Sequence, residues 1–294
     1  MADWQGRRLA VEPGIEIFYR DYPGPETGGG LPVLCLHGLT RNSADFEPIA
    51  PHLARRRRVL AMDVRGRGQS DRDPDWRRYH PGTYVADAFK LLAHEGLDRV
   101  VLLGTSMGGI MSMMMGAARP ELIAGIILND IGPKVEEAGV RRISGYVGAR
   151  EEPFADLAEA VAAIRAINEP FYPDLDDAAW ERYARRLLVR DADGRWRFAY
   201  DPAIRRNFTE ARETAAPDLW AVFDGLAPIP LLVLRGETSD ILAAETLEEM
   251  ARRHPDCTAV TVPNRGHPPL LDEPEAVAAI DAFLARLDAA ARAN

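Results

Sequence analysis

The stretch Val100-Val-Leu-Leu-Gly-Thr-Ser-Met-Gly-Gly-Ile110 places a serine between glycines, directly after an apolar run. Its centre, Gly104-Thr-Ser-Met-Gly108, fits the pattern G-x-S-x-G, with a predicted strand before it and a predicted helix after it. A nucleophile on such a sharp turn adopts unfavourable backbone dihedrals, and only small neighbours avoid a clash there. The turn also exposes the hydroxyl at a helix N-terminus, whose amides favour negative charge. This context predicts that Ser106 is a nucleophile, although the pattern alone would also suit an ordinary tight turn.

The segments around this turn predict the fold. Four short runs, at residues 31–36, 59–62, 100–103 and 125–128, are too continuously apolar for half-exposed strands. Apolar strands resume later in the chain at residues 231–234 and 258–262. Strands buried on both faces are typical of a parallel sheet covered by helices. Helical patterns alternate with these runs, and residues 15–19 follow a Pro-Gly turn that indicates an antiparallel hairpin. We therefore expect a doubly wound, mostly parallel α/β sheet.

The pattern changes between residues 134 and 217. This segment predicts helices at residues 136–147, 154–167, 177–189 and 203–212, with a non-helical stretch at residues 193–200. A helical insert between two strands of one sheet is a lid on a scaffold. We expect a core domain from residues 1–133 and 218–294, with residues 134–217 as a helical cap.

The amino-acid composition and net charge indicate which classes of binding partner the protein can have. The chain has 294 residues, of which 47% are hydrophobic and 28% charged, with a net charge of −9. An acidic surface disfavours binding to nucleic acid and to anionic membranes, so we expect a small-molecule substrate. The chain is expected to be a monomer or a homo-oligomer. The first residues lack the apolar region of a signal peptide, and no segment approaches the length of a membrane span, which predicts a cytoplasmic protein. The two cysteines make no disulfide framework, and no two histidines have metal-ligand spacing, so we expect no metal site.

A serine hydroxyl needs a base to react near neutral pH, and the base needs an orienting acid. Asp240 follows the predicted strand at residues 231–234, and His267 follows the one at residues 258–262. Both therefore lie at the sheet edge that carries Ser106, in the chain order Ser, Asp, His known for this fold. We predict a triad of Ser106, Asp240 and His267. The rival acid is Asp130, which ends the strand at residues 125–128 and occupies a position that some enzymes of this architecture use.

Donors for an oxyanion complete the predicted site. One is the backbone N–H of Met107, which follows the nucleophile. The other is the N–H of Leu39, in the loop His37-Gly-Leu-Thr40 after the first buried strand, where Gly38 permits close approach. An ordinary strand-end turn is the alternative interpretation of His37 and Gly38.

Taken together, these motifs resemble the α/β-hydrolase superfamily. The matching pieces are His37-Gly38, Asp63-x-Arg-Gly-x-Gly-x-Ser70, Gly104-Thr-Ser-Met-Gly108, Arg235-Gly-x-x-x-Asp240 and Gly266-His267. The resemblance implies a cofactor-free hydrolase, and the insert occupies the family's usual cap position. The serine at the turn differs from the aspartate of dehalogenases and epoxide hydrolases and from the cysteine of dienelactone hydrolases. The oxyanion loop differs from those typical of carbon–carbon bond hydrolases and of haloperoxidases. A capped serine carboxylesterase or lactonase remains as the expected type.

The substrate pocket is expected between the cap and the turn. Its candidate lining residues are His37, Gly38, Thr40, Phe171, Trp180 and Trp196. Ligand pockets are mostly apolar, which favours some of the cap's aromatic residues as lining, although for any single one packing within the cap's own core is the favoured role. The alternatives to an esterase are a carbon–carbon bond hydrolase of ring-cleavage diketones, a thioesterase, and a hydrolase-fold ligand receptor.

Overall fold

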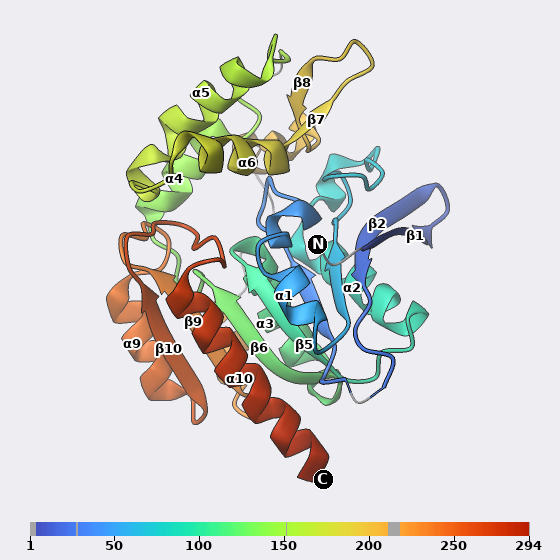
Figure 1. Ribbon diagram of the computed structural model, residues 1–294, viewed down its shortest axis with the longest axis vertical. Helices are drawn as coiled ribbons and strands as arrows, with labels where there is room; N and C mark the ends of the chain where they lie inside the picture. Colours follow the sequence, from blue (N-terminus) through green and yellow to red (C-terminus); the bar gives the residue numbers. More distant parts are fainter. Residues whose placement is uncertain (1–3, 28, 151, 211–217, 294) are drawn as a thin grey trace.

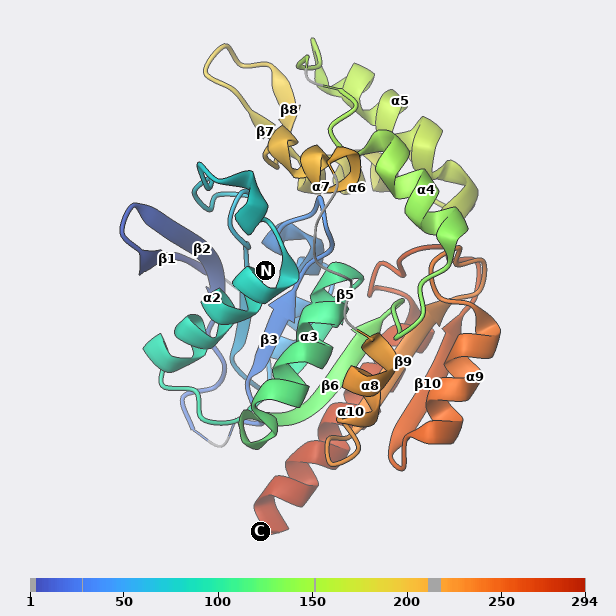
Figure 2. The ribbon, with the colours of Figure 1, turned by 180° about the vertical axis from the view of Figure 1, so that it is seen from behind.

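A computed structural model describes residues 4–27, 29–150, 152–210 and 218–293. The chain forms an eight-stranded sheet in the order β1-β2-β4-β3-β5-β6-β9-β10, with a helical layer on each face (Figures 1 and 2). The strands are β1 Gln5–Glu12, β2 Ile15–Tyr22, β3 Val33–Leu36, β4 Val59–Met62, β5 Val100–Thr105, β6 Ile123–Asn129, β9 Leu231–Gly236 and β10 Cys257–Val262. The β1–β2 and β2–β4 pairs are antiparallel and the others are parallel. The predicted doubly wound, mostly parallel sheet and its N-terminal hairpin are confirmed.

Alternate side chains of the central strands supply two separate cores. On β3, Leu34 and Leu36 face one core, whereas Val33 and Cys35 face the other, and all four are buried. The first core is covered by α2 Pro81–His94, α3 Met107–Ala118, α8 Leu219–Asp224 and α9 Ala244–Arg253. The second is covered by α1 Ala50–Ala54 and α10 Pro274–Ala293. Burial on both faces explains why these strands are continuously apolar.

The segment inserted between β6 and β9, which we call the cap, lies above the carboxyl ends of the strands (Figures 1 and 2). It contains α4 Glu137–Tyr146, α5 Leu157–Asn168, α6 Asp177–Leu187, the hairpin β7 Leu188–Arg190 and β8 Trp196–Phe198, and α7 Arg206–Thr209. The predicted non-helical stretch at residues 193–200 thus belongs to a hairpin. The helix expected at residues 203–212 is shorter, a 3-10 turn followed by α7, and residues 211–217 lie outside the described residues.

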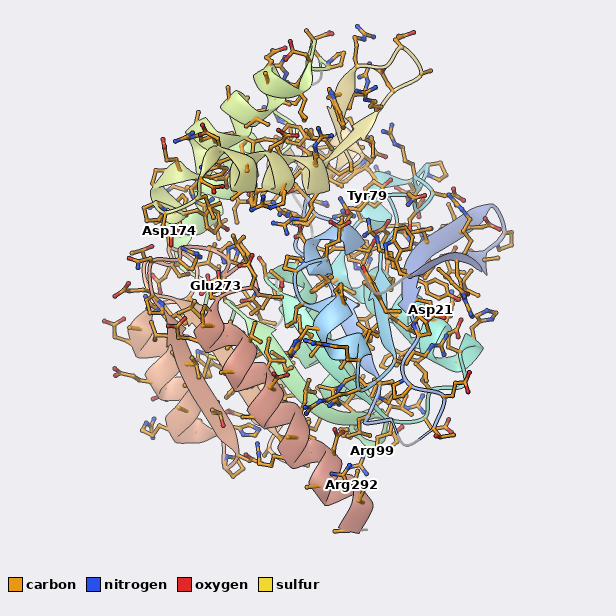
Figure 3. All side chains as sticks on the ribbon, in the orientation of Figure 1. Asp21, Tyr79, Arg99, Asp174, Glu273 and Arg292 are labelled. Carbon is orange, nitrogen blue, oxygen red and sulfur yellow. The ribbon has the colours of Figure 1, made fainter. Side chains whose placement is uncertain are left out.

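Backbone and charged contacts hold the cap to the core. Arg67 and Tyr200 form an antiparallel bridge, and the phenol of Tyr79 donates to Asp201 at 2.7 Å. At the other side, Arg265 pairs with Asp174 of the cap segment at 2.5 Å and with Glu273 of the core at 2.8 Å. Figure 3 labels Asp174 and Glu273 on the two sides of this boundary. The cap is therefore joined to the core both at residues 200–201 and at Asp174.

Within the described ranges, no helix has both the length and the apolar character needed to cross a membrane.

The turn at Ser106 depends on the absence of side chains at two neighbours. Ser106 has φ 53° and ψ −117°, a strained conformation for a residue with a Cβ. A methyl group on Gly108 would lie 1.9 Å from the carbonyl oxygen of Leu36, and one on Gly104 would lie 2.4 Å from that of Gly108. These glycines let α3 begin directly against β3 and β5, which leaves Ser106 at the sheet edge.

We expect Gly108→Ala to lower the free energy of unfolding by about 3 kcal/mol, because the added methyl meets rigid backbone. Gly145→Ala is the matched control, since nothing lies within 4 Å of the added methyl on this helical residue. Alanine there should raise stability by about 0.5 kcal/mol. Urea unfolding of both variants measures the difference. Equal stabilities of the two variants would show that the turn tolerates a side chain.

Candidate active site

Ser106 and His267 form a hydrogen bond at the carboxyl edge of the sheet. Ser106 follows β5, His267 lies in the loop after β10, and Nε2 of His267 is 2.9 Å from Oγ of Ser106. The other ring nitrogen, Nδ1, is 2.8 Å from Oδ2 of Asp130, which follows β6. An ionised carboxylate only accepts hydrogen bonds, so Nδ1–H donates to Asp130 and Nε2 can accept the proton of Ser106. This pairing can raise the nucleophilicity of the hydroxyl.

Three hydrogen-bond donors fix the carboxylate of Asp130. Its side chain is buried, and its backbone has a left-handed φ of 57°. Oδ1 accepts the N–H of Gly236 at 2.8 Å, while Oδ2 accepts the hydroxyl of Ser239 at 2.6 Å in addition to His267. Three donors hold this buried carboxylate in one direction. The imidazole of His267 is consequently held in one orientation.

The position of Asp240 corrects the predicted triad. Its carboxylate accepts a bidentate pair from Arg142 of α4, at 2.6 Å and 2.7 Å, and makes no hydrogen bond to His267 within the described residues. Burial favours a higher pKa for Asp240, but the Arg142 guanidinium outweighs it and holds the pKa below its ordinary value. The preceding residue, Ser239, contacts Asp130 instead. The rival acid identified in the sequence thus contacts the histidine, and Asp240 connects the core to the cap.

The loop after β3 is anchored by its carbonyl groups. His37 is buried, its Nε2 accepts the N–H of Val64 at 3.1 Å, and Nδ1–H donates to the carbonyl of Gly38 at 2.7 Å. Burial lowers the pKa of His37 to about 4, so the ring is neutral near pH 7. Arg67 donates to the carbonyl of Leu39 at 2.9 Å. These contacts fix the loop from its inner side.

The N–H of Leu39 shares a peptide plane with the Gly38 carbonyl and points the opposite way. Among the described residues, neither this N–H nor that of Met107 has a hydrogen-bond acceptor. A methyl group at Gly38 would lie 3.7 Å from Cβ of Ser106, which places the loop beside the hydroxyl. The two predicted oxyanion donors are therefore unpaired amides on elements that border Ser106.

A cavity between the cap and the core opens onto Ser106 and His267. Its lining includes Gly38, Leu39, Thr40, Arg41, Thr105, Arg142, Ile143, Tyr146, Ile164, Ile167, Asn168, Tyr183, Leu187, Phe198, Tyr200 and Pro268. Gly38 and Thr40 were expected in the pocket, whereas Arg41 and Arg142 were not identified as site residues from the sequence. Arginines in a polar surface pattern carry no signal that they border a cavity.

Four residues expected in the pocket lie outside the cavity lining. His37 is buried beneath the loop that it anchors. Trp180 packs edge-on against Tyr183 in the cap's own core, and Trp196 pairs through its backbone with Phe154. Phe171 supports Arg142, whose guanidinium lies 4.3 Å from its ring centre. Packing within the cap and beneath the loop accounts for these side chains.

Within the described ranges, no three histidine, cysteine, aspartate or glutamate side chains are grouped so that they could hold a metal ion.

Comparison with known proteins places this geometry in a family. Residues 33–280 match the model of the alpha/beta hydrolase family. The chain belongs to this family. This hydrolase is 33% identical to 3-hydroxybutyrate-oligomer hydrolase of Cupriavidus necator, over 85% of its own length and 87% of the relative. It is 29% identical to 2-(acetamidomethylene)succinate hydrolase of Mesorhizobium japonicum, over 82% of its own length and 83% of the relative.

Solved structures agree with this assignment. The fold is similar to the crystal structure of an alpha/beta hydrolase from Novosphingobium aromaticivorans, with a TM-score of 0.90 and 46% identity. The similarity covers 97% of this hydrolase and 99% of that chain. The predicted membership of the superfamily is confirmed.

Asparagine variants of Asp130 and Asp240 distinguish which carboxylate orients His267. We expect Asp130→Asn to slow modification of Ser106 by a fluorophosphonate about 10⁴-fold, because the amide would stabilise the wrong tautomer of His267. Asp240→Asn should slow it by less than about tenfold, since it changes only the cap contact. Labelling rates measured by intact mass spectrometry need no knowledge of the substrate. A larger loss in Asp240→Asn than in Asp130→Asn would restore the triad first predicted.

Proposed function

We propose that this hydrolase cleaves carboxylic esters, lactones included, through an acyl-enzyme on Ser106. The observation that supports this most directly is the chain of hydrogen bonds from Asp130 through His267 to Ser106. It ends on a strained turn beside the N–H groups of Leu39 and Met107, which have no acceptor in the part of the chain that the structure describes. Acyl transfer needs these parts together: a nucleophile, a base held in one tautomer, and donors for the oxyanion.

In the proposed mechanism, Ser106 attacks the ester carbonyl while Nε2 of His267 takes the hydroxyl proton. Asp130 stabilises the resulting imidazolium without accepting its proton. The N–H groups of Leu39 and Met107 stabilise the oxyanion, and His267 returns the proton to the departing alcohol. Water then attacks the acyl-enzyme with His267 again as base, which releases the acid and restores the serine.

The choice of an ester bond is supported by one relative. The relative at 33% identity is named a 3-hydroxybutyrate-oligomer hydrolase, and oligomers of a hydroxy acid are joined through ester bonds. Another, at 26% identity, is named 2-hydroxy-6-oxo-6-(2'-aminophenyl)hexa-2,4-dienoic acid hydrolase, which keeps carbon–carbon cleavage as the competing reaction for the experiment to decide.

Ser106→Ala should reduce kcat for 4-nitrophenyl butyrate about 10⁵-fold or more, because no other described group takes the hydroxyl's place beside His267. Release of 4-nitrophenol over many turnovers measures the activity, and an unchanged melting temperature shows that the variant is folded. Multiple turnover in the wild type also distinguishes an enzyme from a ligand receptor. Retention of more than about a tenth of the wild-type rate would exclude Ser106 as nucleophile.

A substrate panel separates the reaction classes. Aryl esters of increasing chain length, lactones, a thioester and a vinylogous diketone are compared by kcat/KM. We expect an ester or lactone to be the best substrate. A diketone cleaved with kcat/KM above that of every ester would assign carbon–carbon cleavage instead.

A further inference from the structure

The charged side chains that line the cavity are of one sign. They are Arg41 and Arg142, and no aspartate or glutamate is among the residues of the lining. This contrasts with the net charge of −9 for the whole chain. The partner carboxylates, Asp45 and Asp240, pair with the two arginines but lie outside the lining. The guanidinium groups therefore border the cavity, while the acids that hold them do not.

Each guanidinium keeps donors beyond those its acid uses. Arg142 donates through Nε and Nη2 to Asp240, and Nη1 has no hydrogen-bond partner within the described residues. Stacking on Phe171, with 4.3 Å to the ring centre, holds the plane of the group. Arg41 likewise donates through Nε and Nη2 to Asp45, and its Nη1 donates to the phenol of Tyr183 at 2.9 Å. A planar guanidinium fixed in this way is suited to bind a second carboxylate.

Tyr146 adds a hydroxyl on the same helix face. It lies four residues after Arg142 on α4, which places the two side chains one above the other, and both line the cavity. Among the described residues its hydroxyl has no hydrogen-bond partner, unlike that of Tyr200, which accepts the N–H of Gly148 at 3.0 Å. Burial raises the pKa of Tyr146 to about 12, so the phenol stays protonated and can donate.

We propose that Arg142 and Tyr146 bind a carboxylate on the substrate, so that this hydrolase acts on small esters that are also carboxylates. This proposal rests on the proposed ester hydrolysis and specifies in addition that the substrate carries a negative charge. Nη1 of Arg142 and the phenol of Tyr146 supply two donors to one anionic group, and Arg41 adds positive charge to the cavity. The isoleucines of the lining, Ile143, Ile164 and Ile167, suit the short apolar part between carboxylate and ester.

Matched ester pairs test the charge requirement. One pair is 4-nitrophenyl hydrogen adipate and 4-nitrophenyl hexanoate, which places the carboxylate on the acyl side. The other is 3-acetoxybutanoate and its methyl ester, which places it on the alcohol side. We expect the wild type to prefer the anionic member of at least one pair by about tenfold or more in kcat/KM, as for one hydrogen bond to a charged group. A preference for the neutral member in both pairs overturns the proposal.

Substitutions of Arg142 and Tyr146 test whether these two residues cause the preference for the anionic ester. Arg142→Gln should lower kcat/KM for the anionic ester about 10- to 100-fold, mainly through KM, and Tyr146→Phe about 3- to 10-fold. Both should leave the neutral ester within about threefold. Arg141→Gln is the matched control, because Arg141 is exposed on the same helix and pairs with Glu137 at 3.0 Å. Equal losses on both esters in the two variants would show a role in holding the cap and contradict carboxylate binding.

A binding experiment separates this proposal from ester hydrolysis itself. Calorimetric titration of Ser106→Ala with glutarate measures carboxylate binding without turnover. We expect binding that is weakened tenfold or more when Arg142→Gln is added and is unchanged when Arg141→Gln is added. If no ester is hydrolysed but glutarate binds in this way, the proposed reaction fails and the carboxylate site stands. If esters are hydrolysed and glutarate does not bind, the carboxylate site fails alone.

Discussion

The close approach of α3 to β3 is the constraint on which the site depends. The helix begins at Met107, and Gly108 lies so near the carbonyl of Leu36 that no side chain fits between them. This contact brings the start of α3 beside the loop that follows β3. The amides of Met107 and Leu39 thus border Ser106 because of backbone packing alone. The strain at Ser106 persists because buried strands on both sides fix the turn.

The parallel sheet supplies the remaining groups to the same edge. Asp130 follows β6 and His267 follows β10, so their side chains meet Ser106 although they are far apart in the sequence. Two carboxylates are present at this edge, and their partners separate their roles. Asp130 is buried and directed at the imidazole by Gly236 and Ser239, whereas Asp240 is paired with a cation of the cap. The Arg142–Asp240 pair consequently connects the proposed carboxylate site to the core.

Much of this could be predicted from the sequence because it follows from periodicity and strand order. Continuous apolar runs predict the sheet, and the residues that follow them predict which side chains reach its carboxyl edge. Such a pattern does not give the direction of a side chain within a loop. Ser239 and Asp240 are adjacent, yet one contacts Asp130 and the other contacts the cap. The acid was therefore assigned to the right edge and to the wrong strand.

The residues that line the cavity are harder to predict than the sheet, because they depend on tertiary packing. Trp180 and Trp196 are large aromatic residues that suit a ligand pocket and the interior of a small helical cap equally well, and in this chain they pack within the cap. Arg41 and Arg142 border the cavity only because Asp45 and Asp240 hold them there, a tertiary arrangement without a local sequence signature.

The central claim is that the reaction passes through a covalent intermediate on Ser106. Rapid quenching of the wild type during turnover of a slowly hydrolysed 4-nitrophenyl ester, followed by peptide mass spectrometry, tests it most directly. We expect the acyl group on Ser106, formed at the rate of the initial burst of 4-nitrophenol. Turnover with no acylated peptide, or with the acyl group on another residue, would contradict it.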